Sequence, residues 1–211
     1  MELYVKSILM KLFFDLDGTL IDSRKRLYKL FQELIPQSSL SFEEYWKLKR
    51  NNIIHSELLS QYFNYKNSEI LLFEKTWMTL IEDDDWLNFD KPFEGVYEYL
   101  ESLKLDDNKI FIVTARHRKD NALTQISNFG WSDLFDEVLV TEQKSPKTEL
   151  IKPYLKTNET NWMISDTGKD IQIGKQLNLK TAAVLTGFLN KDKLLEYNPD
   201  RIVDIVTNLK F

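Results

Sequence analysis

The stretch KLFFDLDGTLIDS, residues 11–23, decides the fold of this chain. Its apolar part, residues 12–14, is the short run typical of a buried strand, and polar, turn-forming residues follow it directly. The strand therefore ends in two carboxylates, Asp15 and Asp17, two residues apart. In an open parallel sheet flanked by helices, ligands bind outside the carboxyl ends of the strands. The stretch thus predicts a functional site at Asp15 and Asp17.

The second half of the chain alternates strand and helix patterns, which is typical of a parallel sheet covered by helices. Apolar, β-favouring runs are separated by helical patterns that begin or end at Pro and Gly residues. The predicted fold class is therefore α/β, a Rossmann-like three-layer core with a parallel sheet. The predicted strands are residues 11–14, 109–114, 137–141, 161–165 and 181–185, with a short last element at 201–206.

Residues 23–85 show helical spacing of apolar residues and no strand-like alternation. Ser41 with Glu44 three residues later predicts a capped helix start. We expect an all-helical domain at 23–85, inserted into a core domain formed by 1–22 and 86–211. The acidic run at 83–85 is interpreted as a solvated turn where the chain returns to the core.

Composition is that of a soluble globular protein, with 43% hydrophobic and 29% charged residues among 211. The net charge of −5 argues against nucleic acid or anionic membranes as partners and favours a small molecule. The absence of cysteine excludes disulfides and thiolate chemistry. Without a spanning apolar run or a signal cleavage site, we expect a cytoplasmic protein. Residues 1–9 are read either as a leader or as an extension of the first strand, and the oligomeric state is left open.

The motif Asp15-x-Asp17-Gly18-Thr19 after an apolar strand resembles the first motif of the haloacid dehalogenase (HAD) superfamily of phosphohydrolases. The resemblance implies that Asp15 is a nucleophile and metal ligand, and that Asp17 is a general acid and base whose backbone carbonyl also binds the metal. Gly18 is implied to bind substrate. In this superfamily a helical cap is inserted just after the first motif, which is where residues 23–85 lie.

Two further motifs are similar to those of the superfamily. Thr114 ends an apolar strand and is followed by Ala115 and Arg116, so the resemblance implies that these three residues bind substrate, with Thr114 donating to a phosphoryl oxygen. A β-favouring Thr at a strand end is the alternative. A catalytic lysine is expected near the helix after the third strand, either Lys147, which we favour, or Lys144.

The fourth resemblance is the acidic loop after the strand at 161–165. Asp166 and Asp170 match the two acids of the superfamily pattern, while Ser165 stands where the family often has Gly. The resemblance implies that Asp166 binds the metal and that Asp170 supports the site without direct coordination. Hard oxygen ligands of this kind suit Mg²⁺.

Together these residues predict a Mg²⁺-dependent phosphatase that hydrolyses a small phosphorylated metabolite through an aspartyl phosphate. A carboxylate needs no base before it attacks phosphorus, but attack on an anion requires a metal ion and a cation to offset the charge. The alternatives are a phosphomutase or phosphotransferase on the same scaffold, and a non-catalytic binding module. Two histidines, His55 and His117, are interpreted as incidental, and residues 24–26 either as a solvated helix face or as contacts for an anionic substrate.

Overall fold

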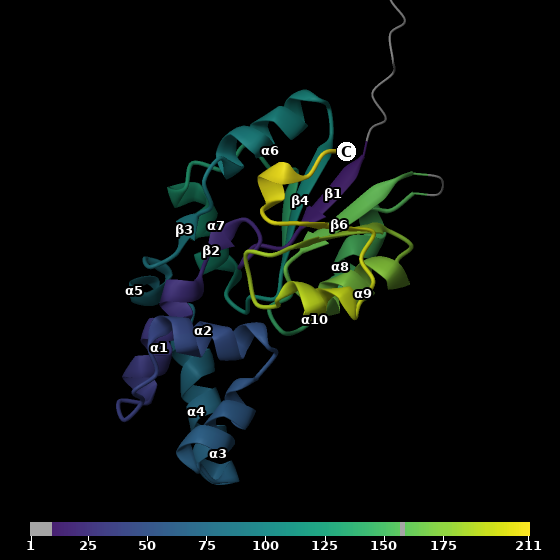
Figure 1. The fold of residues 1–211 in the computed structure, drawn as a ribbon. Coiled ribbons are helices and arrows are strands. Elements are labelled where there is room, and N and C mark those ends of the chain that lie inside the picture. Colours follow the sequence, from purple (N-terminus) through teal and green to yellow (C-terminus); the bar gives the residue numbers. More distant parts are fainter. Residues whose placement is uncertain (1–9, 157–158) are drawn as a thin grey trace, which may run out of the picture.

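The computed structural model describes residues 10–156 and 159–211, so the prediction for residues 1–9 lies outside the described chain. A six-stranded, fully parallel sheet with strand order β5-β4-β1-β6-β7-β8 forms its centre (Figure 1). The predicted α/β fold is confirmed. The strands are β1 (Lys11–Phe14), β4 (Lys109–Thr114), β5 (Glu137–Val140), β6 (Asn161–Ser165), β7 (Lys180–Val184) and β8 (Arg201–Val203).

Strand β1 lies in the middle of the sheet because its three apolar side chains need cover on both faces. Phe13 contributes to the core on one face, whereas Leu12 and Phe14 contribute to the core on the other. In register, Phe14 pairs with Ile112 of β4 and with Ile164 of β6. The carboxyl ends of these three strands therefore meet, which places the residues that follow them at one edge of the sheet.

Helices cover both faces of the sheet, as alternating connections require (Figure 1). The helix after β6 begins at Gly168, where the Thr167 side chain caps it by accepting from the Asp170 N–H. The elements around the sheet are α6 (Val96–Leu105), α7 (Lys119–Asn128), α8 (Lys147–Ile151), η1 (Lys152–Tyr154), α9 (Gly168–Gln176), α10 (Lys191–Leu195) and η2 (Val206–Asn208).

The first four helices of the chain form a separate lobe at one end of the molecule (Figure 1). They enclose their own core, in which Phe31, Tyr45 and Trp77 are buried. The capping box predicted at Ser41 is present, since Ser41 accepts from the Glu44 N–H and Glu44 accepts from the Ser41 N–H. These helices are α1 (Arg24–Leu34), α2 (Phe42–Arg50), α3 (His55–Phe63) and α4 (Asn67–Leu80). We call this lobe the helical cap.

The chain crosses between the sheet and the helical cap through a short antiparallel ribbon. It pairs β2 (Ile21–Asp22) with β3 (Lys91–Pro92), strands too short for a period-two pattern to predict. The acidic run at 83–85 was expected to be a turn, but Asp84 and Asp85 open the short helix α5 (Asp84–Leu87) instead. Acidic residues suit this position because a helix N-terminus carries partial positive charge. Within the described residues, no helix is long and apolar enough to cross a membrane.

Candidate active site

Asp15 lies at the end of β1, and its carboxylate is held by Lys147. The Nζ of Lys147 donates to Oδ1 of Asp15 at 2.6 Å and to Oδ2 of Asp170 at 2.7 Å. Ser165 also donates to Asp170, at 2.8 Å. Although burial opposes the charge of Lys147, Asp15 and Asp170 raise the pKa of this lysine, so the ammonium is charged. One cation from α8 thus bridges two carboxylates from β1 and α9.

The other candidate lysine, Lys144, has a different environment. Its side chain is 75% exposed and pairs with Glu142 at 3.0 Å, although Lys144 also lines the mouth of the pocket described below. The side chain of Lys147, in contrast, is only 6% exposed. Because α8 begins at Lys147, this residue points back toward the end of β1, and Lys144 remains in the preceding turn.

Asp166 follows β6 and is fully buried beside the first motif. Its Oδ2 accepts from the Phe188 N–H at 2.7 Å, and its backbone N–H donates to the Thr19 hydroxyl at 3.1 Å. Gly18 packs against it with φ +80°, and a Cβ on Gly18 would lie 2.6 Å from Oδ2 of Asp166. The N–H of Gly18 donates to the Ile21 carbonyl within the turn, and the Gly18 carbonyl accepts from the Thr186 hydroxyl at 2.6 Å, so both backbone groups of Gly18 have partners.

Three carboxylates lie close together at the carboxyl ends of these strands, but Lys147 pairs with only two of them, Asp15 and Asp170, and not with Asp166. Burial raises the pKa of Asp15 to about 7 against the opposing effect of Lys147, and burial together with Asp15 raises the pKa of Asp166. Among the described residues, no three His, Cys, Asp or Glu side chains gather as a metal cage. The set implied by the first and fourth motifs contains two side chains, Asp15 and Asp166, and a backbone carbonyl at Asp17. Crowded hard oxygen atoms fit Mg²⁺, which usually keeps several waters.

Asp17 points away from Asp15 and is held by two arginines. Arg116 donates from Nε to Oδ2 at 2.8 Å and from Nη2 to Oδ1 at 3.0 Å, and Arg26 from α1 also pairs with Oδ1. Burial alone would raise the pKa of Asp17, but Arg116 and Arg26 outweigh burial and hold this pKa well below its usual range. Asp17 is therefore ionised in this arrangement.

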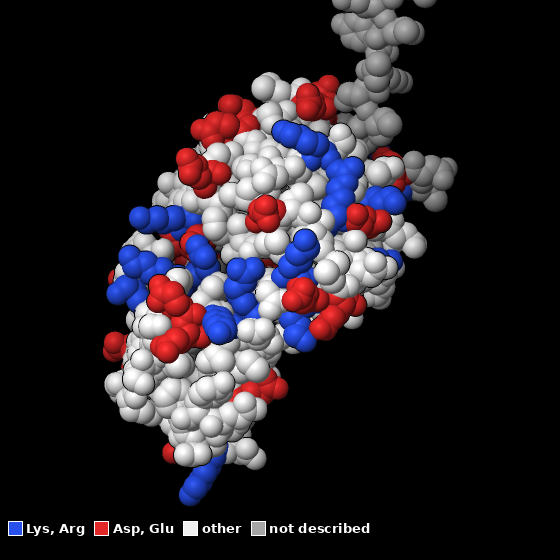
Figure 2. Space-filling view, viewed as in Figure 1, with Lys and Arg blue, Asp and Glu red and all other residues white. Residues whose placement is uncertain are grey.

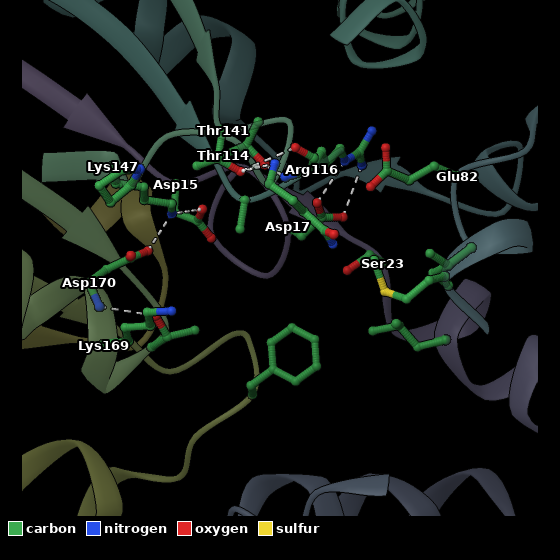
Figure 3. A pocket seen from close by; sticks show the side chains of 18 of the residues that line it. Asp15, Asp17, Ser23, Glu82, Thr114, Arg116, Thr141, Lys147, Lys169 and Asp170 are labelled. Atoms are coloured by element: carbon green, nitrogen blue, oxygen red, sulfur yellow. Dashed lines mark hydrogen bonds and ion pairs between the residues drawn. The ribbon is translucent and has the colours of Figure 1, made fainter. Parts of the chain in front are cut away.

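A cavity of ≈ 830 Å³ opens between the core and the helical cap, and its lining includes Asp15, Lys147 and Asp17. Figure 3 shows Asp15, Lys147 and Asp170 on one side of it, and Asp17, Arg116 and Glu82 on the other. Its lining includes Thr114 and Ala115 from the end of β4, where Thr114 is buried and Ala115 exposed. On the face in Figure 2, basic side chains gather across the middle of the molecule, interspersed with acidic ones.

Three residues that contact this cavity or its arginines were not singled out by motif. Arg26 is only 3% exposed, so it does not belong to the solvated helix face considered for residues 24–26. Asp90 pairs with both arginines, and Glu82 accepts the backbone N–H groups of His117 and Arg118 at 3.0 and 2.9 Å. His117 Nδ1 lies 2.7 Å from Glu82 Oε1, so this histidine also has a partner.

Sequence and fold comparisons agree with this geometry. The model of the haloacid dehalogenase-like hydrolases matches residues 12–184. The chain belongs to this family. It is 28% identical to "Pyrophosphatase PpaX" of Halalkalibacterium halodurans over 93% of each chain, and 26% identical to "Phosphoglycolate phosphatase" of Aquifex aeolicus over 92% of this chain and 93% of the relative. A haloacid dehalogenase-like hydrolase of Streptococcus pneumoniae has the same fold, with a TM-score of 0.75, 21% identity, and coverage of 94% and 95% of the two chains.

Membership of the HAD-like hydrolases confirms the family expected from the first motif. The matched residues include most of β1, all of β4 to β7 and the whole helical cap. The family match covers Asp15, Asp17, Thr114, Lys147 and Asp166.

Proposed function

We propose that this hydrolase is a Mg²⁺-dependent phosphatase that cleaves a small phosphate monoester through an aspartyl phosphate on Asp15. The observation that carries the proposal is the buried contact of Asp15 with Lys147, 2.6 Å apart, at the edge of a cavity that also contains Asp17. Relatives named as a pyrophosphatase and a phosphoglycolate phosphatase support the same reaction class.

In the proposed first step, an Asp15 carboxylate oxygen attacks phosphorus and the bond from phosphorus to the leaving oxygen breaks. Lys147 is proposed to offset negative charge beside the attacking carboxylate. Thr114, Ala115 and Arg116 line the cavity, and they are proposed to donate to phosphoryl oxygens. Asp15, Asp166 and the Asp17 carbonyl are proposed to hold Mg²⁺. When bound, Mg²⁺ supplies a Lewis acid that reduces repulsion between the two anions.

Asp17 is proposed to give a proton to the leaving oxygen and, in the second step, to take one from the water that hydrolyses the aspartyl phosphate. Such proton transfer contributes about 10² to 10⁴ in rate. The carboxylate first has to leave its arginine partners and take up a proton from water, because an ionised, ion-paired Asp17 has no proton to give. Asp170 is proposed to position Lys147 through their 2.7 Å contact.

A substrate screen with the purified chain tests this proposal. Phosphate monoesters, pyrophosphate and p-nitrophenyl phosphate are incubated with Mg²⁺ or with EDTA, and released phosphate is measured beside products separated by chromatography. We expect release that requires Mg²⁺ and Asp15. Phosphate reappearing on a second hydroxyl of the substrate would identify a phosphomutase, and no turnover with no phosphoenzyme would identify a binding module.

A further inference from the structure

Arg26 and Arg116 form a pair that is held by further contacts besides those with Asp17. Arg26 Nη1 donates to the Ile81 carbonyl at 3.0 Å, and Arg116 Nη1 donates to Gln125 Oε1 at 2.7 Å. Each arginine side chain is only 4% exposed. Arg26 comes from the helical cap and Arg116 from the loop after β4, so the pair lies at the junction of cap and core.

Asp90 holds the side of this pair that faces away from Asp17. Its carboxylate has no exposed surface, and it lies 3.0 Å from Arg26 Nε and 3.3 Å from Arg116 Nη2. Gln125 Nε2 donates to Asp90 at 3.0 Å. The contact between Arg26 Nε and Asp90 Oδ1 lacks hydrogen-bond geometry, so these two buried atoms interact by charge without an aligned bond.

The charges balance only while Asp17 remains in place. Two guanidinium groups face the carboxylates of Asp17 and Asp90, and only Asp17, with a side chain 20% exposed, is accessible from the cavity. If Asp17 turns toward a leaving oxygen, the arginines lose one of two anions. An unpaired buried charge is strongly unfavourable, so another anion has to replace Asp17.

We propose that Arg26 and Arg116 are a leaving-group anion subsite, which Asp17 occupies in the absence of substrate. The inference rests on the proposed phosphatase activity and narrows its substrate class. The substrate is a phosphate ester or anhydride whose leaving group carries its own carboxylate or second phosphoryl group. Guanidinium groups bind both kinds of anion through paired N–H donors. When the arginines bind the anion of the substrate, Asp17 is released and can take part in proton transfer.

Glu82 is a further carboxylate at this end of the cavity, and its partners lie in the loop after β4. This carboxylate lines the same cavity, but its oxygens accept from the His117 and Arg118 N–H groups and lie beside the His117 ring. Its charge is thus directed to the loop after β4. At this end of the cavity, an anion in place of Asp17 meets the N–H groups of the two arginines and the Ser23 hydroxyl. If these two arginines and the carboxylates of Asp17 and Asp90 only stabilised the contact between cap and core, no substrate preference would be expected.

Matched substrates separate these roles. We compare kcat/KM for 2-phosphoglycolate against the uncharged 2-phosphoglycolamide, and for ethylene glycol bisphosphate against 2-hydroxyethyl phosphate. Both pairs are esters with similar leaving groups, so the two arms report a carboxylate and a phosphoryl group separately. Since charge-assisted hydrogen bonds to one anion are involved, we expect the wild type to prefer the anionic member of at least one pair about 10- to 100-fold. Equal values within both pairs in the wild type overturn the subsite.

Variants then assign the preference to the arginines. Arg26→Gln and Arg116→Gln should each lose most of it, mainly through KM of the anionic substrate, and Arg26→Lys should retain part. Arg24→Gln is the matched control, because Arg24 lies on the same helix and pairs with Asp22 at 2.6 Å, outside the cavity. An unchanged preference in folded Arg26→Lys and Arg116→Gln proteins overturns the assignment.

p-Nitrophenyl phosphate distinguishes failure of the subsite from failure of the proposed function. This ester has a good, uncharged leaving group and needs neither the subsite nor a protonated Asp17. If the wild type hydrolyses it but shows no preference for anionic leaving groups, the subsite is wrong and the phosphatase stands. If no substrate is hydrolysed at all, both fail.

Discussion

Asp15 and Asp17 are two residues apart in the chain, yet they lie in opposite electrostatic surroundings. Asp15 shares the ammonium of Lys147 with Asp170, and burial raises its pKa to about 7. Asp17 is paired with two arginines, and its pKa is lowered. The partners of Asp15 all belong to the core, whereas those of Asp17 come from the core and from the helical cap. The proposed nucleophile is therefore held by the sheet domain alone, whereas the proposed acid–base group also depends on the cap.

Replacing Asp15 should produce the largest effect, because it removes the proposed nucleophile. In Asp15→Asn we expect phosphatase activity to fall by at least about 10⁴-fold, since an amide is a poor nucleophile and a weaker metal ligand. Rapid quenching and intact-mass measurement should detect no phosphoryl group on this variant with any substrate. A phosphoenzyme that survives the loss of Asp15 would place the nucleophile elsewhere.

Asp17→Asn should produce the second-largest effect and a different kinetic signature. The backbone carbonyl and Asp15 remain, so mainly proton transfer is lost, and turnover should fall by about 10² to 10⁴. An ester with a good leaving group can still phosphorylate Asp15, and the intermediate should persist because nothing activates water. Intact mass should then show an added phosphoryl group. Hydrolysis at the wild-type rate would contradict the role assigned to Asp17.

One half of the site is formed by Asp15, Lys147, Asp166 and Asp170, and we call it the Asp15 half. It could be predicted from the sequence because local patterns specify it. A short apolar run places Asp15 at a strand end, a second run does the same for Asp166, and neighbouring parallel strands bring their ends together. The choice between Lys147 and Lys144 was harder. It depended on the first residue of α8, and helix boundaries are poorly determined by pattern alone.

The Asp17 half, formed by Asp17, Arg116, Arg26 and Asp90, was only partly accessible from the sequence. Motifs marked Asp17 and Arg116, but no local pattern marks the burial of Arg26 or Asp90. Arg26 stands between Lys25 and Leu27 in a helix whose charges suggest a solvated face. Its burial results from pairing with Asp17 and Asp90, and Asp90 enters only where the chain returns from the helical cap. A charged residue is buried when its partners are, and partners distant in sequence become visible only in the fold.

Lys147→Met should reduce turnover by about 10²- to 10³-fold, the cost typical of losing one group that stabilises charge in the transition state. Methionine has a similar length but cannot neutralise Asp15. This variant therefore tests whether the charge of Lys147 is what the Asp15 half of the site requires. Lys144→Met is the matched control, because Lys144 is exposed and paired with Glu142, and should retain near-wild-type activity. The reverse ranking of the two variants in kcat/KM would transfer the role to Lys144.

The smallest effect concerns the helical cap, which carries Arg26 and so supports the Asp17 half. His55 packs among the rings of Phe31, Phe73 and Trp77, its Nε2 lies 2.8 Å from the Tyr45 hydroxyl, and burial lowers its pKa well below the usual value of 6.5. The folded state therefore favours the neutral ring. As pH falls below 6.5, the unfolded state takes up the proton first, so the free energy of unfolding decreases.

For this single group, lowering the pH from 7.5 to 5.5 should reduce the free energy of unfolding by about 1.4 kcal/mol, one pKa unit of linkage. Urea denaturation at the two pH values measures the decrease. His55→Gln, which keeps a polar group near Tyr45 but cannot be protonated, should lose most of this decrease. His117→Gln, at the junction with Glu82, controls for the other histidine and should retain it. If His55→Gln and the wild type lose the same stability on acidification, the dependence arises from other groups, and the cap core is not the part of the molecule that acid weakens.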